Sequence, residues 1–543
     1  MRDHLLHHLL EQSAHIYPDN VAIVFKDKSV TYSELERQSS ELALKLLRLG
    51  VKKGDRVGIT LAKSIESIVS LFGILKTGAI YVPIDPAAPV SRVAYIIKHC
   101  GIECLIASSR NLDMLLSGST DTATINKAII TGKEGEQPNH KHLLAECLSF
   151  AGETCGDLAE FQTVDLPDCS PAYILHTSGS TGNPKGVAIS HLNALTFINM
   201  AADFFEIHTN DRFCNHAPLH FDLSVFDIFV AIKCGATVVL LPELLSTFPV
   251  KLAEYVSKEK ITIWNSVSSV LTMLADKGMM ELHSFDSLRV VHFSGDIMPV
   301  KYLRVLSRYL SNASFYNIYG QTEANSSLYY PVQQIPDSES WRIPIGRPFP
   351  NFEVFALNDA QAIIGREGEE GELYISSSTV ALGYWNNEGM TDEKFVPDPR
   401  QDCFDNIVYR TGDRVRIDEN GDYLFAGRKD HMVKSRGYRI ELEEIEIVLS
   451  GHPEIMAAVV VPIPDELVGN RIAAVIVPIH GHTLATAEVV RYCAPLLPKY
   501  MIPEIMEFRE SFPTTSSGKV DRKRLAAVVA APNVSDGITG VGW

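Results

Sequence analysis

The sequence lacks the cysteine pattern of a disulfide-bonded or zinc-ribbon protein. Its nine cysteines are scattered over 543 residues, are odd in number and include no C-x-x-C pair. Disulfide frameworks and zinc ribbons depend on paired, closely spaced cysteines. We therefore expect most of these thiols to be buried or incidental.

Long apolar runs and an excess of positive charge are also missing. No apolar stretch reaches the roughly 20 residues that span a bilayer. The N-terminal sequence MRDHLLHHLLEQ has no basic start, continuous apolar run or small-residue cleavage site. A net charge of −17 would repel nucleic acid and anionic membranes over most of the surface. These absences predict a cytoplasmic protein with no nucleic-acid or membrane partner.

The sequence does contain alternating strand and helix patterns. Apolar runs such as RVGITL, ATVVLL and LRVVHFSG alternate with helical patterns such as YSELERQSSELALKLLRLG. This order is typical of an α/β protein with largely parallel sheets. A polar stretch over about 108–166 predicts a surface excursion.

The C-terminal part has a different character. GRKDHMVKSRGYRIELEEIEIVL predicts a strand, a turn, a strand and a helix, and AAVVVPI and RIAAVIVPI predict two more strands. Because single hydrophobic cores stop growing near about 250–300 residues, a chain of this length should form more than one domain. We expect a core domain over 1–429, a small α+β domain over 430–530 and a disordered tail over 531–543.

The stretch HTSGSTGNPKG, residues 176–186, indicates a loop that holds phosphate. Its glycines let backbone N–H groups converge on an anion, its hydroxyl groups add donors and Lys185 adds charge. It is not a Walker loop, because Gly186 follows Lys185, nor a dinucleotide fingerprint, because Gly179 and Gly182 are three residues apart. Taken by itself, the stretch is equally consistent with a flexible surface turn.

Seven further motifs give this stretch a context. In chain order they are LKTGAIYVPIDP (75–86), HFDLSVFD (220–227), NIYGQTE (317–323), GELYISS (371–377), YRTGD (409–413), GRKDHMVKSRGYRIELEEIE (427–446) and SSGKVDRKRL (516–525). Together with TSGSTGNPKG they resemble, in order and over nearly the whole chain, the adenylate-forming enzymes: acyl-CoA synthetases, luciferases and the adenylation domains of nonribosomal peptide synthetases. The resemblance implies an α/β fold, with two β-α subdomains and a distorted β-barrel in the N-terminal domain and a small mobile C-terminal domain.

The resemblance also implies a reaction. A carboxylate attacks the α-phosphate of ATP, pyrophosphate leaves, and a carrier thiol then takes the acyl group. Positioning and charge stabilisation dominate such chemistry. Lys519 would bridge the carboxylate, ribose and α-phosphate, Thr322 would contact the α-phosphate and Glu323 would hold Mg²⁺. Asp430 would be the hinge that brings Lys434 toward the thioester-forming site.

The nucleotide site is implied in the same way. The glycine loop would cradle the β- and γ-phosphates, Tyr319 would lie against adenine and Asp413 would accept both ribose hydroxyls. The full set is Thr177, Ser178, Gly179, Ser180, Thr181, Gly182, Lys185, Asn317, Tyr319, Gly320, Gln321, Thr322, Asp413, Arg428 and Lys519.

Asp222 indicates the class of acid. In relatives that activate α-amino acids, an aspartate at this position pairs with the substrate ammonium, and a desolvated carboxylate without a cation would be costly. Phe221 matches the aromatic gate on the thiol tunnel. The remaining substrate residues are carried over by spacing: Leu223, Phe226, Asn265, His292, Ser294, Gly295, Ile318, Ser326 and Ser327. Several polar donors favour a small or polar side chain, with cysteine, serine, threonine, alanine, glycine and proline all open.

Three departures from the commonest peptide-synthetase pattern are Gln321 in place of proline, Ser517 in place of asparagine and His176 in place of an aromatic residue. We expect no carrier domain after Lys519, because the residues that follow it are too few to form one. We therefore expect an amino acid ligase that loads a separate phosphopantetheinylated carrier protein. The alternatives are an acid–CoA ligase that uses free coenzyme A and an inactive scaffold that has kept the fold.

Overall fold

The computed structural model describes residues 4–118, 124–132, 138–140, 142, 144–151, 157–158, 160–338, 341–430, 432–480, 482–513 and 520–530. These form two compact units. The larger contains 1–177 and 184–430, and the smaller contains 178–183 with residues from 431 onward. The predicted tail 531–543 lies outside the described residues, as does Lys519. None of the helices described is both long and apolar enough to cross a bilayer.

The first sheet of the larger unit has nine strands and is largely parallel. In spatial order it consists of β16 (Arg347–Pro348), β15 (Asn325–Val332), β14 (Ser314–Gln321), β13 (Val290–Ser294), β12 (Ile263–Val267), β10 (Arg212–Asn215), β11 (Thr237–Leu240), β1 (Val21–Phe25) and β2 (Lys28–Thr31). The predicted strands ATVVLL and LRVVHFSG are β11 and β13.

The second sheet has eight strands. Its order is β19 (Gly383–Tyr384), β9 (Lys185–Ser190), β8 (Pro171–Thr177), β4 (Ile80–Pro83), β3 (Arg56–Thr60), β5 (Cys104–Ser108), β6 (Lys127–Thr131) and β7 (Glu146–Ser149). The last two strands correct one expectation, because the polar stretch 108–166 is not a simple surface excursion. Its short apolar segment AII, residues 128–130, is buried in β6 and extends the sheet in parallel.

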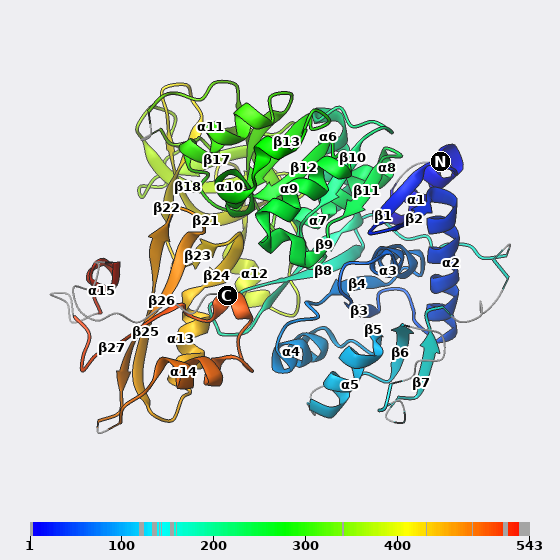
Figure 1. Cartoon of the computed structure of the whole chain (residues 1–543), viewed down its shortest axis with the longest axis horizontal. Coiled ribbons are helices and arrows are strands. Elements are labelled where there is room, and N and C mark those ends of the chain that lie inside the picture. The colour runs from blue at the N-terminus through cyan, green and yellow to red at the C-terminus, as the bar shows by residue number, and fades with distance from the viewer. Residues whose placement is uncertain are drawn as a thin grey trace. The chain divides into compact units, whose positions relative to one another are not determined.

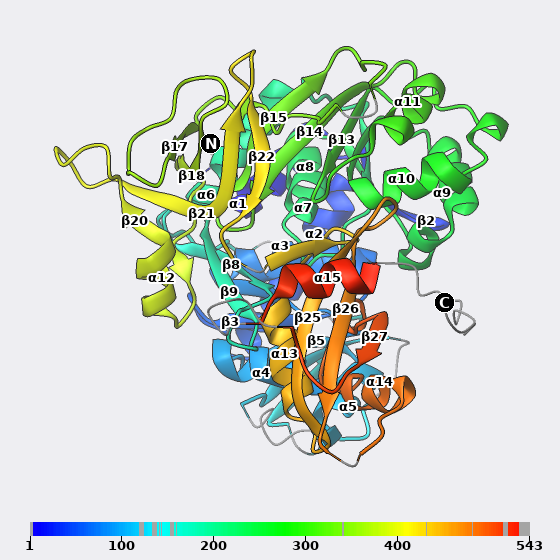
Figure 2. The ribbon, with the colours of Figure 1, turned by 90° about the vertical axis from the view of Figure 1, so that its left-hand side faces the viewer.

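A third sheet has five strands and corresponds to the distorted β-barrel expected from the resemblance (Figure 2). It is formed by β17 (Glu353–Leu357), β18 (Glu370–Ser376), β21 (Ile407–Ile417), β20 (Phe395–Pro397) and β22 (Tyr423–Arg428). Its ladders are antiparallel. The helix α12 (Glu388–Lys394) packs beside β20.

The other helices of the larger unit are α1 (Leu6–Ile16), α2 (Tyr32–Arg48), α3 (Ile65–Lys76), α4 (Val90–Cys100), α5 (Ser109–Gly118), α6 (His191–Phe204), α7 (Leu223–Val225), η3 (Phe226–Val230), α8 (Ala231–Lys233), η4 (Glu243–Thr247), α9 (Pro249–Lys258), α10 (Ser268–Lys277), η5 (Met280–Leu282) and α11 (Val300–Tyr309). The predicted helix α2 begins at a capping box, in which Thr31 accepts from the backbone of Glu34 and Glu34 reaches back. Gly50, with a φ of +76°, follows its end.

Strand alternation distributes the core over both faces of the two large sheets. Ile263 of β12 lies in the core shared by both sheets, to which α1, α2, α3 and α6 contribute. Its neighbour Trp264 points the other way and packs with residues of α9, α10 and α11. Figure 1 shows these three helices beside β12 and β13. In the second sheet Leu105 faces α4 and α5, whereas Ile106 faces the shared core. The predicted α/β fold is confirmed.

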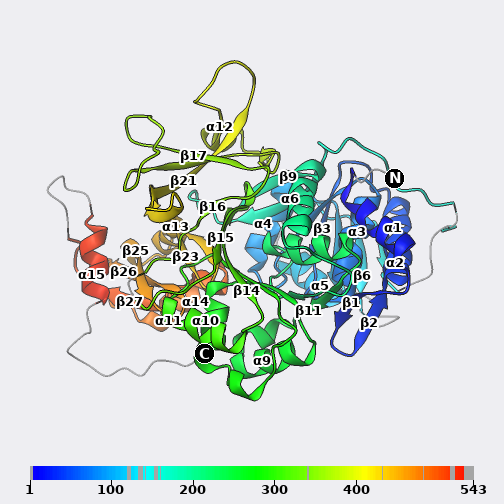
Figure 3. The ribbon, with the colours of Figure 1, turned by 90° about the horizontal axis from the view of Figure 1, so that it is seen from above.

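The smaller unit is an α+β assembly. It contains the hairpin β23 (Met432–Ser435) and β24 (Tyr438–Glu441), the sheet β25 (Ile455–Asp465), β26 (Gly469–Pro478) and β27 (Ile505–Phe508), and the helices α13 (Leu442–Ser450), α14 (Thr486–Cys493), η6 (Lys499–Met501) and α15 (Arg522–Ala530). The predicted order of strand, turn, strand and helix over 427–449 is present as β23, β24 and α13. Figure 3 shows α15 beside β25, against which it packs.

Candidate active site

The NIYGQTE motif ends β14 and turns into β15. Gly320 lies opposite Ser326, and a Cβ on this glycine would come within 2.2 Å of the carbonyl oxygen of Asn325. Only a residue without a side chain allows the two strands to approach so closely. The side chains that flank this glycine contact three different parts of the larger unit.

The first contact is with Asp413 on β21, a carboxylate that is only 2% exposed. It accepts hydrogen bonds from the Tyr319 phenol, from the Gln321 amide (2.6 Å) and from the Arg428 guanidinium. The Gln321 carbonyl oxygen accepts from the Tyr409 phenol. Burial, and then the adjacent Asp413 carboxylate, raise the pKa of Tyr319, so the phenol remains a donor. Four predicted nucleotide residues are thereby brought together.

Arg428 extends this cluster to the end of the larger unit. Its Nε and Nη2 donate to Asp430 at 2.6 and 2.7 Å. Asp430, the predicted hinge residue, is the last residue of the larger unit. The Arg428 guanidinium donates to both Asp430 and Asp413. We keep the hinge role of Asp430 as a prediction.

The second contact is made by Glu323, whose side chain is fully buried. Its Oε1 accepts a hydrogen bond from the Tyr384 phenol at 2.7 Å and lies 3.4 Å from Nζ of Lys185, the first residue of β9. The same ammonium lies 4.8 Å from the centre of the Tyr384 ring. A buried carboxylate needs such partners, because desolvation strongly disfavours an isolated charge.

The third contact joins Thr322 to Asp222. Thr322 Oγ1 donates to Asp222 Oδ2 at 2.9 Å. Asp222 directly precedes α7, and from Phe226 the helix takes the wider π form of η3. Single-turn π segments are rare and are frequent at functional sites. The predicted α-phosphate contact and the predicted ammonium partner are therefore neighbours.

Four predicted substrate residues lie on three neighbouring parallel strands, in their middle or toward their carboxyl ends. Asn265 on β12 pairs in register with His292 on β13, and Ser294 pairs with Ile318 on β14. Parallel strands present their carboxyl ends at one edge, where ligands bind in α/β sheets. The Asn265 amide donates to the Leu223 carbonyl at 3.4 Å.

His292 lies in an aromatic group. Its ring centre is 4.9 Å from that of Phe226, 4.1 Å from that of Phe205 and 5.9 Å from that of Tyr316. Burial lowers the pKa of His292 to about 3, so its imidazole is neutral at physiological pH. Its Nε2 is buried and has no hydrogen-bond partner among the residues described.

The other substrate candidates lie after β13, on β15 and before α7. Gly295 follows Ser294 with a φ of +91°, and Ser327 is buried on β15, where its hydroxyl donates to the carbonyls of Ala324 and Asn325. Ser326 is half-buried beside it. Phe221 precedes Asp222, with its ring 5.0 Å from that of His220.

The glycine stretch is a hairpin loop between β8 and β9, with Thr177 opposite Lys185. Thr177 Oγ1 is buried and has no hydrogen-bond partner in the described part of the chain. The loop residues 178–183 group with the smaller unit, in which Ser178 donates to the Arg439 carbonyl at 2.8 Å and the Gly179 N–H to Glu444 at 3.3 Å.

Some predicted residues are not part of these clusters. In the glycine loop, Ser180 and Thr181 are exposed and Gly182 has a φ of +84°. Asn317 donates to the Pro344 carbonyl at 2.8 Å, and Lys434 lies on β23 of the smaller unit. Lys519 and Ser517 lie outside the residues that the structure describes.

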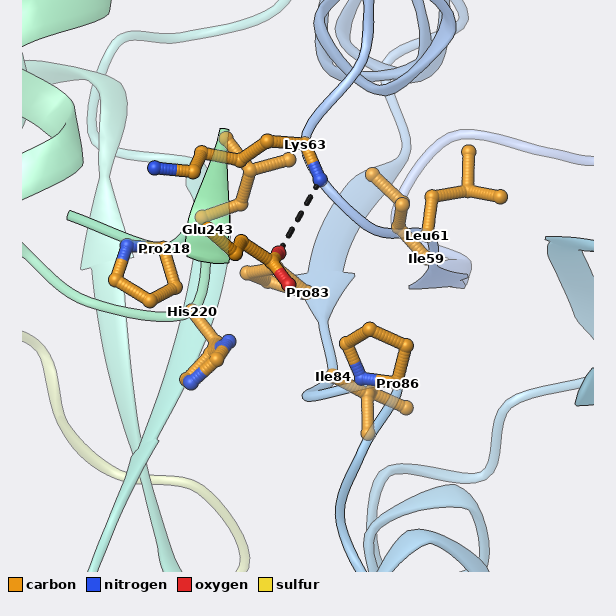
Figure 4. A pocket seen from close by; sticks show the side chains of 10 residues that line it. Ile59, Leu61, Lys63, Pro83, Ile84, Pro86, Pro218, His220 and Glu243 are labelled. Atoms are coloured by element: carbon orange, nitrogen blue, oxygen red, sulfur yellow. Dashed lines mark hydrogen bonds between the residues drawn. The ribbon is translucent and has the colours of Figure 1, made fainter. Parts of the chain in front are cut away.

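A small pocket opens beside His220 (Figure 4). Apolar residues at the ends of β3 and β4 line it together with Pro218, His220, Lys63 and Glu243. The Lys63 backbone N–H donates to Glu243, and its ammonium donates to the carbonyls of Asn215 and His216. Burial lowers the pKa of Lys63 to about 8 and also lowers that of His220. His220 is partly buried, and its lowered pKa favours the neutral imidazole.

Two family models match the chain, AMP-binding enzyme over residues 10–385 and AMP-binding enzyme C-terminal domain over residues 444–519. The chain belongs to the AMP-binding enzyme family. It is 34% identical over 525 residues to the L-proline--[L-prolyl-carrier protein] ligase of Pseudomonas fluorescens, which covers 97% of this chain and 99% of that protein. It is 32% identical over 502 residues to the ligase of the same name from Streptomyces coelicolor, with 91% of each chain covered. The predicted family is confirmed.

A solved structure shares the fold. The Vibrio cholerae adenylation domain AlmE, in complex with glycyl-adenosine-5′-phosphate, matches with a TM-score of 0.83 at 23% identity, covering 98% of both chains. Two α/β sheets, a third antiparallel sheet and a separate C-terminal unit are therefore the family's architecture in this chain as well.

Sequence reasoning missed two side chains that complete the site of this AMP-binding enzyme. Tyr384, on the two-residue strand β19, contacts both Glu323 and Lys185, and Tyr409 contacts Gln321. The spacing of the sequence motifs does not identify either tyrosine as a site residue. Tyr409 lies in the YRTGD motif, and only the pairing of sheets brings it to β14.

Gln321 is a testable positioning residue. Gln321→Leu keeps the bulk of the side chain but removes one donor to Asp413 and the acceptor of Tyr409. Because a hydrogen bond to a charged group contributes about 1.5–3 kcal/mol, we expect the KM for ATP to rise about tenfold with little change in kcat. Steady-state pyrophosphate exchange measures both, with Gln334→Leu at an exposed position as control. An unchanged KM would remove Gln321 from the nucleotide site.

Proposed function

We propose that the protein activates a small or polar α-amino acid with ATP, forming an aminoacyl-adenylate and pyrophosphate, and then transfers the aminoacyl group to the phosphopantetheine thiol of a separate carrier protein. The observation that carries this proposal is the turn Tyr319–Glu323. It links the Asp413 cluster, Asp222 and the Glu323–Lys185 pair within one unit.

The acid side of the reaction rests on Asp222. Its carboxylate would pair with the substrate ammonium, and the Thr322 hydroxyl, which donates to Asp222 in this structure, would turn to donate to the α-phosphate when the nucleotide binds. The ammonium and the reacting carboxylate of an α-amino acid are separated by one carbon atom. A residue pair at 2.9 Å is therefore close enough to address both ends of such a small substrate.

The side-chain pocket supports a small substrate. His292 is flanked by Phe205 and Phe226, and the Asn265 amide is already engaged with a backbone carbonyl. The unpartnered Nε2 of His292 is one polar group left to address a substrate side chain. Cysteine, serine, threonine, alanine, glycine and proline all remain candidates. L-proline is the first to test, because the chain is similar to two L-proline--[L-prolyl-carrier protein] ligases.

On the nucleotide side, Asp413 would accept the ribose hydroxyls and Tyr319 would lie against adenine. Arg428, Tyr319 and Gln321 hold the Asp413 carboxylate in place through hydrogen bonds. The buried, unpartnered hydroxyl of Thr177 fits a phosphate oxygen. Lys185, directly across the hairpin, would supply positive charge.

Glu323 itself offers carboxylate oxygen, the ligand that a hard divalent cation prefers, and it already faces the positive charge of Lys185 at 3.4 Å. When bound, Mg²⁺ would neutralise charge on the phosphates. Glu323 would hold it, and Tyr384 would orient the Glu323 carboxylate through its 2.7 Å hydrogen bond.

The proposal includes a hinge at Asp430, Lys519 as the catalytic cation of the first half-reaction and Lys434 near the thioester-forming site of the second. It also includes domains over 1–429 and 430–530 and a location in the cytoplasm, where ATP and carrier proteins meet. The hinge and the two lysine roles rest on the family motifs quoted above, and the location rests on the expected absence of a signal sequence.

The test is ATP–pyrophosphate exchange with each proteinogenic amino acid, D-alanine, β-alanine and a set of aryl acids, followed by transfer to a phosphopantetheinylated carrier protein or to free coenzyme A. We expect exchange with one or a few small amino acids and thioester formation on the carrier. Exchange with aryl or fatty acids only, together with a coenzyme A product, would identify an acid–CoA ligase instead. No exchange with any acid would favour an inactive scaffold.

A further inference from the structure

The larger unit contains a compact group of metal-ligating side chains that the proposed reaction does not use. His99 and Cys100 end α4, and His176 lies on β8. One ligand atom from each residue lies within 4.8 Å of the other two. We propose that His99, Cys100 and His176 form a binding site for Zn²⁺.

The distance between Cys100 and His176 agrees with tetrahedral coordination. Bonds of about 2.3 Å to sulfur and about 2.0–2.1 Å to nitrogen place the two ligand atoms about 3.6 Å apart at a tetrahedral angle. Cys100 Sγ lies 3.7 Å from His176 Nε2. One thiolate and two imidazoles are the soft and borderline donors that select Zn²⁺ over Mg²⁺ or Ca²⁺.

The polar atoms of this group are poorly satisfied by protein partners. The Nδ1 atoms of His99 and His176 are buried and have no hydrogen-bond partner among the described residues. Burying a polar group without a partner costs free energy, so a bound cation would relieve part of this cost at His99. The His99 side chain is only partly buried, which gives a metal ion a route to the group.

Zn²⁺ binding requires neutral imidazoles and a deprotonated thiol, so it would release the proton of the Cys100 thiol. A coordinated Zn²⁺ deprotonates a thiol outright, and the thiolate then offsets one of its two charges.

The site would connect α4 to the stem of the glycine loop. His176 pairs with Gly186, and the next pair along the hairpin is Thr177 with Lys185. A Cβ on Gly186 would lie 3.1 Å from His176 Nε2, so the imidazole packs closely against β9. Zn²⁺ binding would therefore fix the strand that leads directly into this loop.

The experiment uses the full chain without a histidine tag, stripped with a chelator. Co²⁺ is titrated as a spectroscopic substitute, followed by displacement with Zn²⁺. We expect about one Co²⁺ per chain, a sulfur-to-cobalt charge-transfer band in the near ultraviolet, and a higher unfolding temperature with Zn²⁺ because the metal binds the folded state.

Cys100→Ser should abolish the band, and His176→Phe or His99→Gln should weaken Co²⁺ binding at least tenfold. Cys104→Ser removes a buried thiol from β5, the strand that follows α4 in the chain. This variant should leave the charge-transfer band and the Co²⁺ affinity unchanged. Circular dichroism without metal establishes that each variant is folded. The absence of a sulfur band in the unmodified protein, or its persistence in folded Cys100→Ser, would overturn the proposal. Both readouts are independent of the adenylation reaction.

Discussion

Replacing Lys519 by alanine is expected to lower the kcat of ATP–pyrophosphate exchange by about 10²–10³-fold, which is typical when one preorganised donor to a developing charge is removed. The attacking carboxylate and the α-phosphate are both anions, so their approach needs a cation between them. In the SSGKVDRKRL motif, Lys519 is the residue to which the family resemblance gives this task.

A matched control lies in the same basic segment. Lys523, on α15, is exposed, and Lys523→Ala removes the same charge without the same predicted contact. We expect it to exchange pyrophosphate at nearly the normal rate. Transfer of the aminoacyl group from chemically prepared adenylate to the carrier should also survive in Lys519→Ala. Equal losses in both variants would indicate a general effect of basic charge and would contradict the assigned role.

The second large effect is expected at Asp222. Asp222→Asn keeps the shape of the side chain and an oxygen that can accept from Thr322, but it removes the charge that would pair with the substrate ammonium. Neutralising one partner of a desolvated charge pair costs about 2–5 kcal/mol. We expect kcat/KM for the cognate amino acid to fall about 30- to 3,000-fold, at 1.4 kcal/mol per tenfold.

The same motif offers the control for this variant. Asp227 is also buried, but its carboxylate accepts a hydrogen bond from the Asn215 amide at 3.1 Å rather than from Thr322. Asp227→Asn should therefore change kcat/KM little. The carboxylic acid that lacks the amino group should not lose activity in Asp222→Asn. A parallel loss with this analogue would show that Asp222 has a structural role rather than one in ammonium recognition.

Local patterns predicted many of the elements correctly. The capping box at Thr31 and the glycine at position 50 define α2 from nearby residues alone, and continuous apolar runs define β11 and β13. The polar stretch 108–166 was the clearest error. It contains only a short apolar segment, and β6 is a strand because β5 offers it a parallel edge.

The site was predicted less completely than the fold. Asp413, Tyr319 and Arg428 were identified from their motifs, and the structure joins them through hydrogen bonds. Tyr384 was missed because its contacts with Glu323 and Lys185 join segments 61 and 199 residues apart. No periodicity connects positions so distant in the chain.

The sequence by itself determined the family, the α/β alternation and the charged groups on which the proposed chemistry depends, because these are encoded in contiguous motifs. Only the tertiary structure decided which groups meet. It attached Gln321 to Asp413, Thr322 to Asp222 and Tyr384 to Glu323. It also brought the end of α4 to His176 on β8, where scattered cysteines and histidines had given no sign of a metal site. Such contacts depend on how sheets and helices pack, since neighbours across a sheet are set by strand order and register rather than by distance along the chain.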